Sequence, residues 1–166
     1  MPLHPSHVAP DFTLPVAGGG QVSLAELRAA HERGVVVYFY PKAATPGCTT
    51  EACDFRDNLA SLRGAGFGVV GVSADPVEDL EAFAADQHLT FPLASDADHT
   101  VAEAYGTWGP LTFGDRTFDG VHRSTFVVNP DGTLRLAWYD VAADGHVRTL
   151  RAELGVLEPV DAAVRP

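Results

Sequence analysis

The chain has 166 residues, of which 46% are hydrophobic and 20% charged, a composition typical of a folded globular domain rather than of a disordered segment. It carries 11 Lys and Arg against 22 Asp and Glu, giving a formal net charge of −11, and has no basic cluster. Nucleic acid and anionic membranes are therefore poor candidates for partners. We expect one domain over residues 1–166, with enough interior for a hydrophobic core.

The sequence also indicates the compartment. The longest purely apolar run, VVVYFY at 35–40, is far shorter than the ~18 residues that a membrane helix requires. Residues 1–10, MPLHPSHVAP, have neither a basic segment nor an apolar core, so we expect no secretory signal and a cytoplasmic location. In a reducing compartment, paired cysteines are more often catalytic or metal-binding than structural.

The first third of the chain predicts strands on either side of a helix. AGGGQ at 17–21 reads as a turn between short strands around 12–14 and 21–23. SLAELRAAHERG predicts a helix that begins after Ser23 as N-cap and ends at Gly34. The run 35–40 follows as a strand that is apolar on both faces and therefore buried.

Helices and strands then continue to alternate. A helix through the cysteines closes at RGAG (63–66), and FGVVGVSA is a second buried strand. DPVEDLEAFAADQ starts a helix, with Asp75 as its cap and Pro76 at its first position. TFPLAS predicts a short strand and DHTVAEAYG a short helix.

The last part predicts a hairpin and a terminal helix. STFVVNPDGTLRLAWYD reads as two strands joined by an NPDG turn, and GHVRTLRAEL as the helix. Strands alternating with helices, then a hairpin and a helix, indicate an α/β protein with a mixed central sheet flanked by helices. This order of elements is that of a thioredoxin-like fold.

The stretch YFYPKAATPGCTTEACDFRD, residues 38–57, holds both cysteines of the chain. With Thr45 as N-cap and Pro46 at the first helical position, Cys48 falls in the first turn. Free N–H groups and the positive end of the helix dipole stabilise a thiolate there. One apolar stripe of this helix faces the core: Cys48, Ala52, Phe55, Leu59 and Leu62.

Cys53 is not placed for a simple disulfide. In an intact helix its Cα would lie roughly 8.7 Å from that of Cys48, whereas a disulfide requires less than about 7 Å. The two thiols can therefore join only if the start of the helix unwinds. The alternative is that they are two unrelated buried thiols. Two ligands without a nearby His are too few for a metal site.

The segment FYPKAATPGCTTEACDFRD resembles the active-site segment of peroxiredoxins of the bacterioferritin comigratory protein (Q) subfamily. Pro41, Thr45 and Cys48 fit the family pattern P-x-x-x-T-x-x-C, and Cys53 stands where many members keep a resolving cysteine. HRSTFVVNPDG is similar to the segment that supplies the family's arginine, here Arg123. AYGTWG and YDVAADGHVRTL extend the resemblance over nearly the whole chain.

The resemblance implies a thioredoxin-dependent thiol peroxidase that needs neither metal nor organic cofactor. Cys48 would attack hydrogen peroxide or an alkyl hydroperoxide and become a sulfenic acid. Arg123 would stabilise the thiolate and transition state, Thr45 would orient the peroxide, and Pro41 would shield the site. Cys53 would then form an intramolecular disulfide with Cys48, which a thioredoxin-type donor reduces.

Several residues keep a structural alternative. Thr45 can serve as a helix cap only, Pro41 can simply end a strand, and Arg123 alone would read as a surface residue. Glu51 either pairs with an arginine or favours the helix N-terminus, and the second interpretation is preferred. The histidines have no ligand or catalytic spacing, and Trp108 is interpreted as packing.

Two sets of positions depart from the family's pattern. Ala43 and Ala44 stand where relatives often carry acidic residues, and we expect this difference to tune the surface rather than the chemistry. The segment PLTFGDRTFDG is individual to this chain and leaves the substrate-side rim undefined.

Two other functions compete with the peroxidase. A redox-sensing module on the same scaffold would use oxidation of Cys48 to switch a partner surface. A thiol–disulfide oxidoreductase is disfavoured because the chain lacks C-x-x-C. We expect a monomer or weak dimer, because no long exposed apolar edge calls for assembly.

Overall fold

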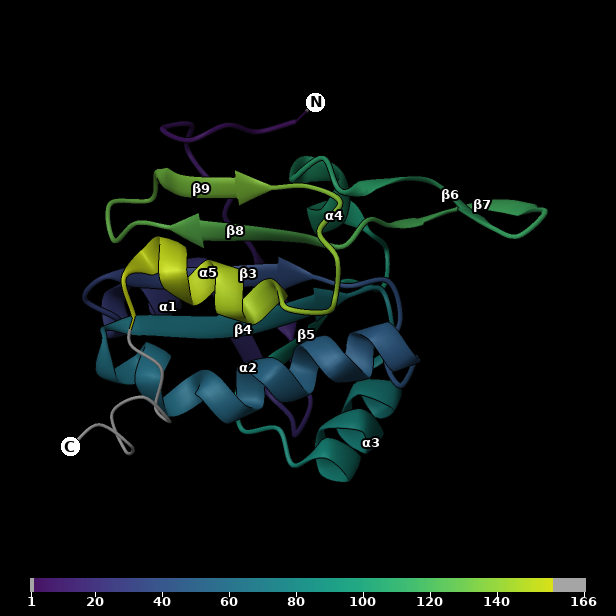
Figure 1. The fold of residues 1–166 in the computed structure, drawn as a ribbon, viewed down its shortest axis with the longest axis horizontal. Coiled ribbons are helices and arrows are strands. Elements are labelled where there is room, and N and C mark those ends of the chain that lie inside the picture. The colour runs from purple at the N-terminus through teal and green to yellow at the C-terminus, as the bar shows by residue number, and fades with distance from the viewer. Residues whose placement is uncertain (1, 157–166) are drawn as a thin grey trace.

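The computed structural model describes residues 2–156, and its centre is a five-stranded mixed sheet (Figure 1). Three strands are parallel: β3 (Gly34–Phe39), β4 (Phe67–Ser73) and β5 (Leu93–Ser95). The hairpin of β8 (Ser124–Val128) and β9 (Leu134–Trp138) adds antiparallel to β3, giving the order β5-β4-β3-β8-β9. The predicted α/β fold with a mixed central sheet is confirmed.

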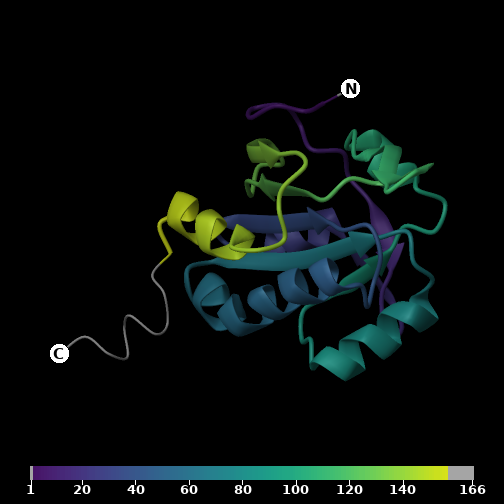
Figure 2. The ribbon, with the colours of Figure 1, turned by 45° about the vertical axis from the view of Figure 1, so that its right-hand side comes forward.

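Within residues 2–156, five helices complete the layers (Figure 2). They are α1 (Leu24–Ala30), α2 (Pro46–Gly64), α3 (Val77–Gln87), α4 (Thr100–Ala104) and α5 (His146–Leu154). Side chains of α2, α3 and α5 pack on one face of the sheet, and those of α1 and α4 on the other. Strand β3 serves both cores because its side chains alternate: Tyr38 joins the first, and Val37 and Phe39 the second.

Two small antiparallel pairs lie outside the central sheet. β1 (Thr13–Pro15) pairs with β2 (Gln21–Ser23) across the predicted glycine turn. β6 (Trp108–Phe113) pairs with β7 (Arg116–Val121) in a hairpin that projects from the body (Figure 1). The sequence did not predict this second hairpin, because Pro110 and two glycines dilute its strand pattern.

Two predicted helix ends are wrong. α1 ends at Ala30, not at Gly34, because His31 turns into extended backbone and its ring packs over Gly68 of β4. The N-cap of α3 is Pro76, so Asp75 does not cap it. The Asp75 carboxylate instead accepts hydrogen bonds from the Ala43 N–H at 2.7 Å and from Ser73 at 2.9 Å.

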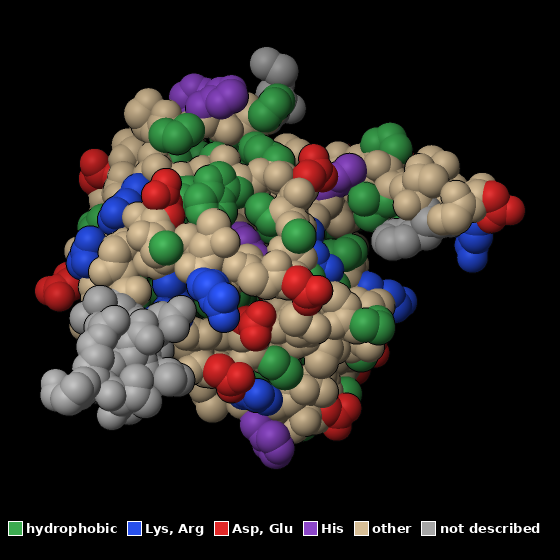
Figure 3. All heavy atoms as spheres, in the orientation of Figure 1, with side chains coloured by type: hydrophobic (Ala, Val, Ile, Leu, Met, Phe, Trp, Pro, Cys, Tyr) green, Lys and Arg blue, Asp and Glu red, His purple; other side chains and the backbone are tan. Residues whose placement is uncertain are grey.

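The described surface carries mixed charge. On the face that shows α2 and α5, lysine and arginine side chains are interspersed with acidic ones and form no basic patch (Figure 3). Among residues 2–156, no helix is both long and apolar enough to cross a bilayer. The domain predicted over residues 1–166 includes residues 157–166, which lie outside the described part, so its extent stays a prediction.

Gly34 offers a test of the strand packing. Its φ is +124°, and a Cβ there would overlap the Val128 carbonyl oxygen on the neighbouring strand. We expect Gly34→Ala to lower the free energy of unfolding by about 2–4 kcal/mol in urea denaturation. Gly64→Ala, where a Cβ meets no other atom, is the matched control. A cost for Gly34→Ala no larger than that of the control would contradict this packing.

Candidate active site

The first turn of α2 places Cys48 as predicted. Thr45 occupies the N-cap position and Pro46 follows it, so Cys48 lies in the first turn and is only 1% exposed. The Thr45 hydroxyl does not cap the helix, however, because it donates to the Lys42 carbonyl at 2.8 Å. The cap position was predicted correctly, and the capping hydrogen bond was not.

Arg123 brings the positive charge to Cys48. It immediately precedes β8, and its Nη2 donates to Cys48 Sγ at 3.2 Å. A Cβ at Gly47 would lie 3.1 Å from the same Nη2, so glycine leaves room for the guanidinium. In a chain of net charge −11, this contact gives the thiolate a local cation.

Glu51 shares the same guanidinium. It is fully buried, and its Oε1 accepts from Arg123 Nη1 at 2.5 Å. Burial raises the pKa of Glu51 to about 7, although the neighbouring Arg123 lowers it. Burial disfavours the charge on Arg123, but Glu51 and Cys48 together raise the pKa of Arg123. The preferred interpretation of Glu51, a charge at the helix N-terminus, is wrong, because its partner is Arg123.

His146 lies next to Glu51, the partner of Arg123. It is the first residue of α5, is buried, and its Nε2 lies 2.7 Å from Thr125 Oγ1 and 3.9 Å from Glu51 Oε2. Burial, and secondarily Arg123, lowers the pKa of His146 to about 4. At neutral pH the imidazole is therefore uncharged, and Arg123 is the cation that faces Glu51.

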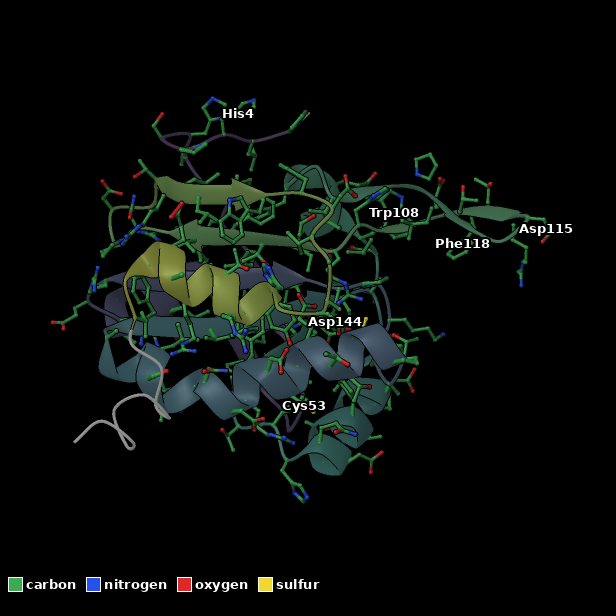
Figure 4. All side chains as sticks on the ribbon, in the orientation of Figure 1. His4, Cys53, Trp108, Asp115, Phe118 and Asp144 are labelled. Carbon is green, nitrogen blue, oxygen red and sulfur yellow. The ribbon has the colours of Figure 1, made fainter. Side chains whose placement is uncertain are left out.

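A largely apolar cleft of about 390 Å³ lies beside Arg123, the residue that contacts the Cys48 thiol. Its lining comes from the 41–47 segment and the β6–β7 hairpin, with Arg123 between them: Pro41, Lys42, Thr45, Pro46, Gly47, Leu111, Phe118, Gly120, Val121 and Arg123. Figure 4 shows Phe118 on the projecting hairpin. The rim that the sequence left undefined is thus a wall of this cleft.

Cys53 lies apart from this cluster. Both cysteines are free thiols, and Cys53 is partly exposed on α2 (Figure 4). Its Sγ lies 3.2 Å from Gln87 Oε1 at the end of α3. The structure therefore brings Cys48 and Arg123 into contact. Thr45 and Pro41 line the cleft beside Arg123. Cys53 is separate from them and contacts Gln87 instead.

Sequence reasoning gave no role to His146 or Gln87, and for Glu51 it named pairing with an arginine only as the less favoured alternative. Only Glu51 had a usable local signal, since it follows Cys48 by three residues on the face that otherwise carries apolar side chains. A carboxylate on such a face indicates a buried partner. Among residues 2–156, no group of three or more His, Cys, Asp or Glu side chains is placed to hold a metal ion.

The fold and the site define a class: a thioredoxin-like protein with a cysteine at a helix N-terminus beside a partly buried arginine. Comparison with known proteins agrees. The AhpC/TSA family profile matches residues 5–137. A putative peroxiredoxin of Mycobacterium tuberculosis is 53% identical over 154 residues, covering 93% of this chain and 96% of that protein. Peroxiredoxin Bcp of Escherichia coli is 43% identical over 145 residues, covering 87% and 91%.

Solved structures show the same relationship. The bacterioferritin comigratory protein of Xanthomonas campestris, studied for alkyl peroxide reduction, superposes with a TM-score of 0.78 at 37% identity, over 87% of this chain and 90% of that one. Peroxidoxin BcpB of Mycobacterium tuberculosis gives 0.78 at 32%, over 98% of both. The chain belongs to the peroxiredoxins of the AhpC/TSA family, in the bacterioferritin comigratory protein (Q) subfamily, and is a thiol peroxidase.

The Arg123–Glu51 pair can be tested through stability. Arg123→Met leaves a buried carboxylate without its cation, and we expect it to cost about 3 kcal/mol of unfolding free energy. Arg123→Met combined with Glu51→Gln should cost clearly less than Arg123→Met alone, because no charge is left unpaired. Urea denaturation of both variants and of Glu51→Gln checks this. Additive costs would contradict the pairing.

His146 predicts an acid-side loss of stability. Its folded pKa, about 4, lies below the ordinary 6.5, so the unfolded chain binds a proton that the folded protein does not as pH falls through this window. Each pH unit there costs at most about 1.4 kcal/mol. We expect His146→Gln to lose less stability than the parent between pH 6.5 and pH 4.5, measured in urea. Equal slopes would show that His146 takes up its proton in the folded state.

Proposed function

We propose that Cys48 is the peroxidatic nucleophile and that Arg123 activates it. The observation that carries this proposal is the 3.2 Å hydrogen bond from the guanidinium to Cys48 Sγ at the start of α2. The thiolate attacks one peroxide oxygen, the O–O bond breaks, and the leaving oxygen takes a proton to become water or an alcohol. Cys48 becomes a sulfenic acid, and Arg123 stabilises the charge that develops.

Thr45 and Pro41 are proposed to hold the substrate. Because the Thr45 hydroxyl donates its proton to the Lys42 carbonyl, its oxygen can accept a hydrogen bond from the peroxide O–H. Pro41 lines the same cleft and presents apolar surface to it. Together they orient the peroxide and limit water near Cys48.

Cys53 is proposed as the resolving cysteine. It would attack the sulfenic acid after the start of α2 unwinds, giving an intramolecular disulfide that a thioredoxin-type donor reduces. The support is that Cys53 is the other thiol in the chain and lies on the same helix as Cys48. A cytoplasmic location, a monomeric or weakly dimeric state and the absence of a cofactor belong to the same proposal.

The cleft favours organic hydroperoxides alongside hydrogen peroxide. Its walls include Leu111, Phe118 and Val121, which can contact an alkyl chain but offer nothing to a small polar peroxide. The relative from Xanthomonas campestris, studied for alkyl peroxide reduction, supports this substrate class.

Intact mass after one equivalent of hydrogen peroxide tests the two cysteines. We expect the parent protein to lose two hydrogens, because a disulfide forms, and Cys53→Ser to gain one oxygen on Cys48. Cys48→Ser is the control and should stay unchanged. No mass change in the parent would contradict activation of Cys48, and oxygen retained without a disulfide would contradict the role of Cys53.

The hairpin wall gives a second test. Phe118→Asp should raise the KM for an aromatic hydroperoxide such as cumene hydroperoxide by roughly three- to tenfold, because apolar contact is lost. The second-order rate constant for hydrogen peroxide should stay within about twofold. Thr117→Ala, on the same strand but not lining the cleft, is the control. Equal effects on both peroxides would argue against an alkyl subsite.

A further inference from the structure

Two hydrogen bonds join the middle of α2 to Gln87, the last residue of α3. Cys53 Sγ donates to Gln87 Oε1 at 3.2 Å, and Arg56 Nη1 donates to the Gln87 backbone carbonyl at 2.7 Å. Cys53 and Arg56 are three residues apart on one helix, so they present to the same side of α2. Both of these hydrogen bonds therefore end on the same residue, one on the side chain of Gln87 and the other on its backbone carbonyl.

Gln87 is well fixed for such a role. It is the last residue of α3, and His88 follows in the left-handed conformation with φ of +55°. The last four carbonyls of a helix lack partners within it, and a cation near them is favourable. The Arg56 guanidinium donates to one of these carbonyls, that of Gln87. This hydrogen bond holds the Gln87 backbone, and with it the side-chain amide that accepts from Cys53, against α2.

The structure shows the hydrogen bond between Cys53 and Gln87 with α2 wound. In the intact helix the two cysteine Cα atoms are roughly 8.7 Å apart, beyond the limit of about 7 Å for a disulfide. Cys53 must therefore leave Gln87 before it can reach Cys48. Because the bond is made in the wound state and lost in the unwound one, it shifts the equilibrium towards the wound helix.

We propose that Gln87 is a positioning residue that retains Cys53 on wound α2 and so slows closure of the disulfide, an inference that rests on the proposed role of Cys53. In the closing step Cys53 sulfur bonds to Cys48 sulfur, the S–O bond of the sulfenic acid breaks, and the Cys53 proton leaves with the hydroxyl group as water. While the thiol donates to Gln87, that proton stays on sulfur and the thiol is not the attacking thiolate.

Retention of Cys53 has a consequence for the oxidised enzyme. A slower closure lengthens the life of the Cys48 sulfenic acid, and a second peroxide can then oxidise it to the sulfinic acid. Gln87 thus determines what fraction of the Cys48 sulfenic acid becomes the disulfide and what fraction is oxidised further to the sulfinic acid. The first oxidation of Cys48 takes place at a different contact and is not affected.

Three variants separate this role from general stability. Gln87→Leu keeps a similar size but removes the acceptor, and Gln87→Glu keeps an oxygen in reach of Cys53. Asp86→Leu adds an apolar side chain at the neighbouring exposed position of α3 and is the matched control. Near-ultraviolet circular dichroism establishes that each variant is folded.

The first measurement uses reduced protein without peroxide. We expect Gln87→Leu to raise both the alkylation rate of Cys53 and the hydrogen exchange of amides in residues 46–53 by roughly three- to tenfold, the size of one lost hydrogen bond. Gln87→Glu should be no faster than the parent, and Asp86→Leu should match the parent. Unchanged rates in Gln87→Leu, or an equal rise in Asp86→Leu, would overturn the inference.

The second measurement follows one turnover by rapid quenching and mass. Gln87→Leu should close the disulfide roughly three- to tenfold faster and accumulate less sulfinic acid at high peroxide, with an unchanged rate of Cys48 oxidation. Unchanged or slower closure would contradict the inference. A parent protein that forms no disulfide, together with faster alkylation in Gln87→Leu, would instead contradict the role of Cys53 and leave the retention by Gln87 supported.

Discussion

The site depends on one partly buried guanidinium shared by two acidic groups. Arg123 donates to Cys48 Sγ and to Glu51, and both partners are almost completely removed from water. In this environment an unpaired charge is costly, so the guanidinium, the carboxylate and the thiol hold one another in place. The chain has a net charge of −11, and among the described hydrogen bonds Arg123 is the cation that contacts the thiol.

The protonation state of Glu51 determines how much of the positive charge of Arg123 acts on the Cys48 sulfur. When Glu51 is ionised, it shares the positive charge with Cys48, and when it is protonated the charge acts on the thiolate alone. Burial raises the pKa of Glu51 to about 7, so both forms are accessible near neutral pH. His146, kept neutral by the same burial, adds no second cation to this balance.

In the proposed mechanism, helix α2 links the reaction at Cys48 to a conformational change. Its first turn holds Cys48 against Arg123, and its middle holds Cys53 against Gln87. In the proposed mechanism the first contact favours reaction in the wound state, and the second would stabilise that same state until Cys53 is released. The β6–β7 hairpin adds a wall to the cleft but makes no contact with either sulfur among the described hydrogen bonds.

Features set by neighbouring residues could be predicted from the sequence, and those set by distant residues could not. The apolar stripe of α2 and the position of Cys48 follow from local spacing, and both were confirmed. The partner of Glu51 lies 72 residues away, so no spacing pointed to it. The end of α1 was mispredicted because packing of His31 on Gly68 is a tertiary contact. The resemblance to a family supplied Arg123, which composition alone would have left as a surface residue.

The most direct test of this account is the rate at which hydrogen peroxide oxidises Cys48 in the Cys53→Ser background, with and without the change Arg123→Met. If the shared guanidinium activates the thiol, the second-order rate constant at pH 7 should fall by roughly 100-fold or more, while the Cys53→Ser parent reacts rapidly. Glu51→Gln is added to both proteins so that no buried carboxylate is left unpaired. Similar rate constants with and without Arg123 would contradict the account and would leave the start of α2 alone as the source of reactivity.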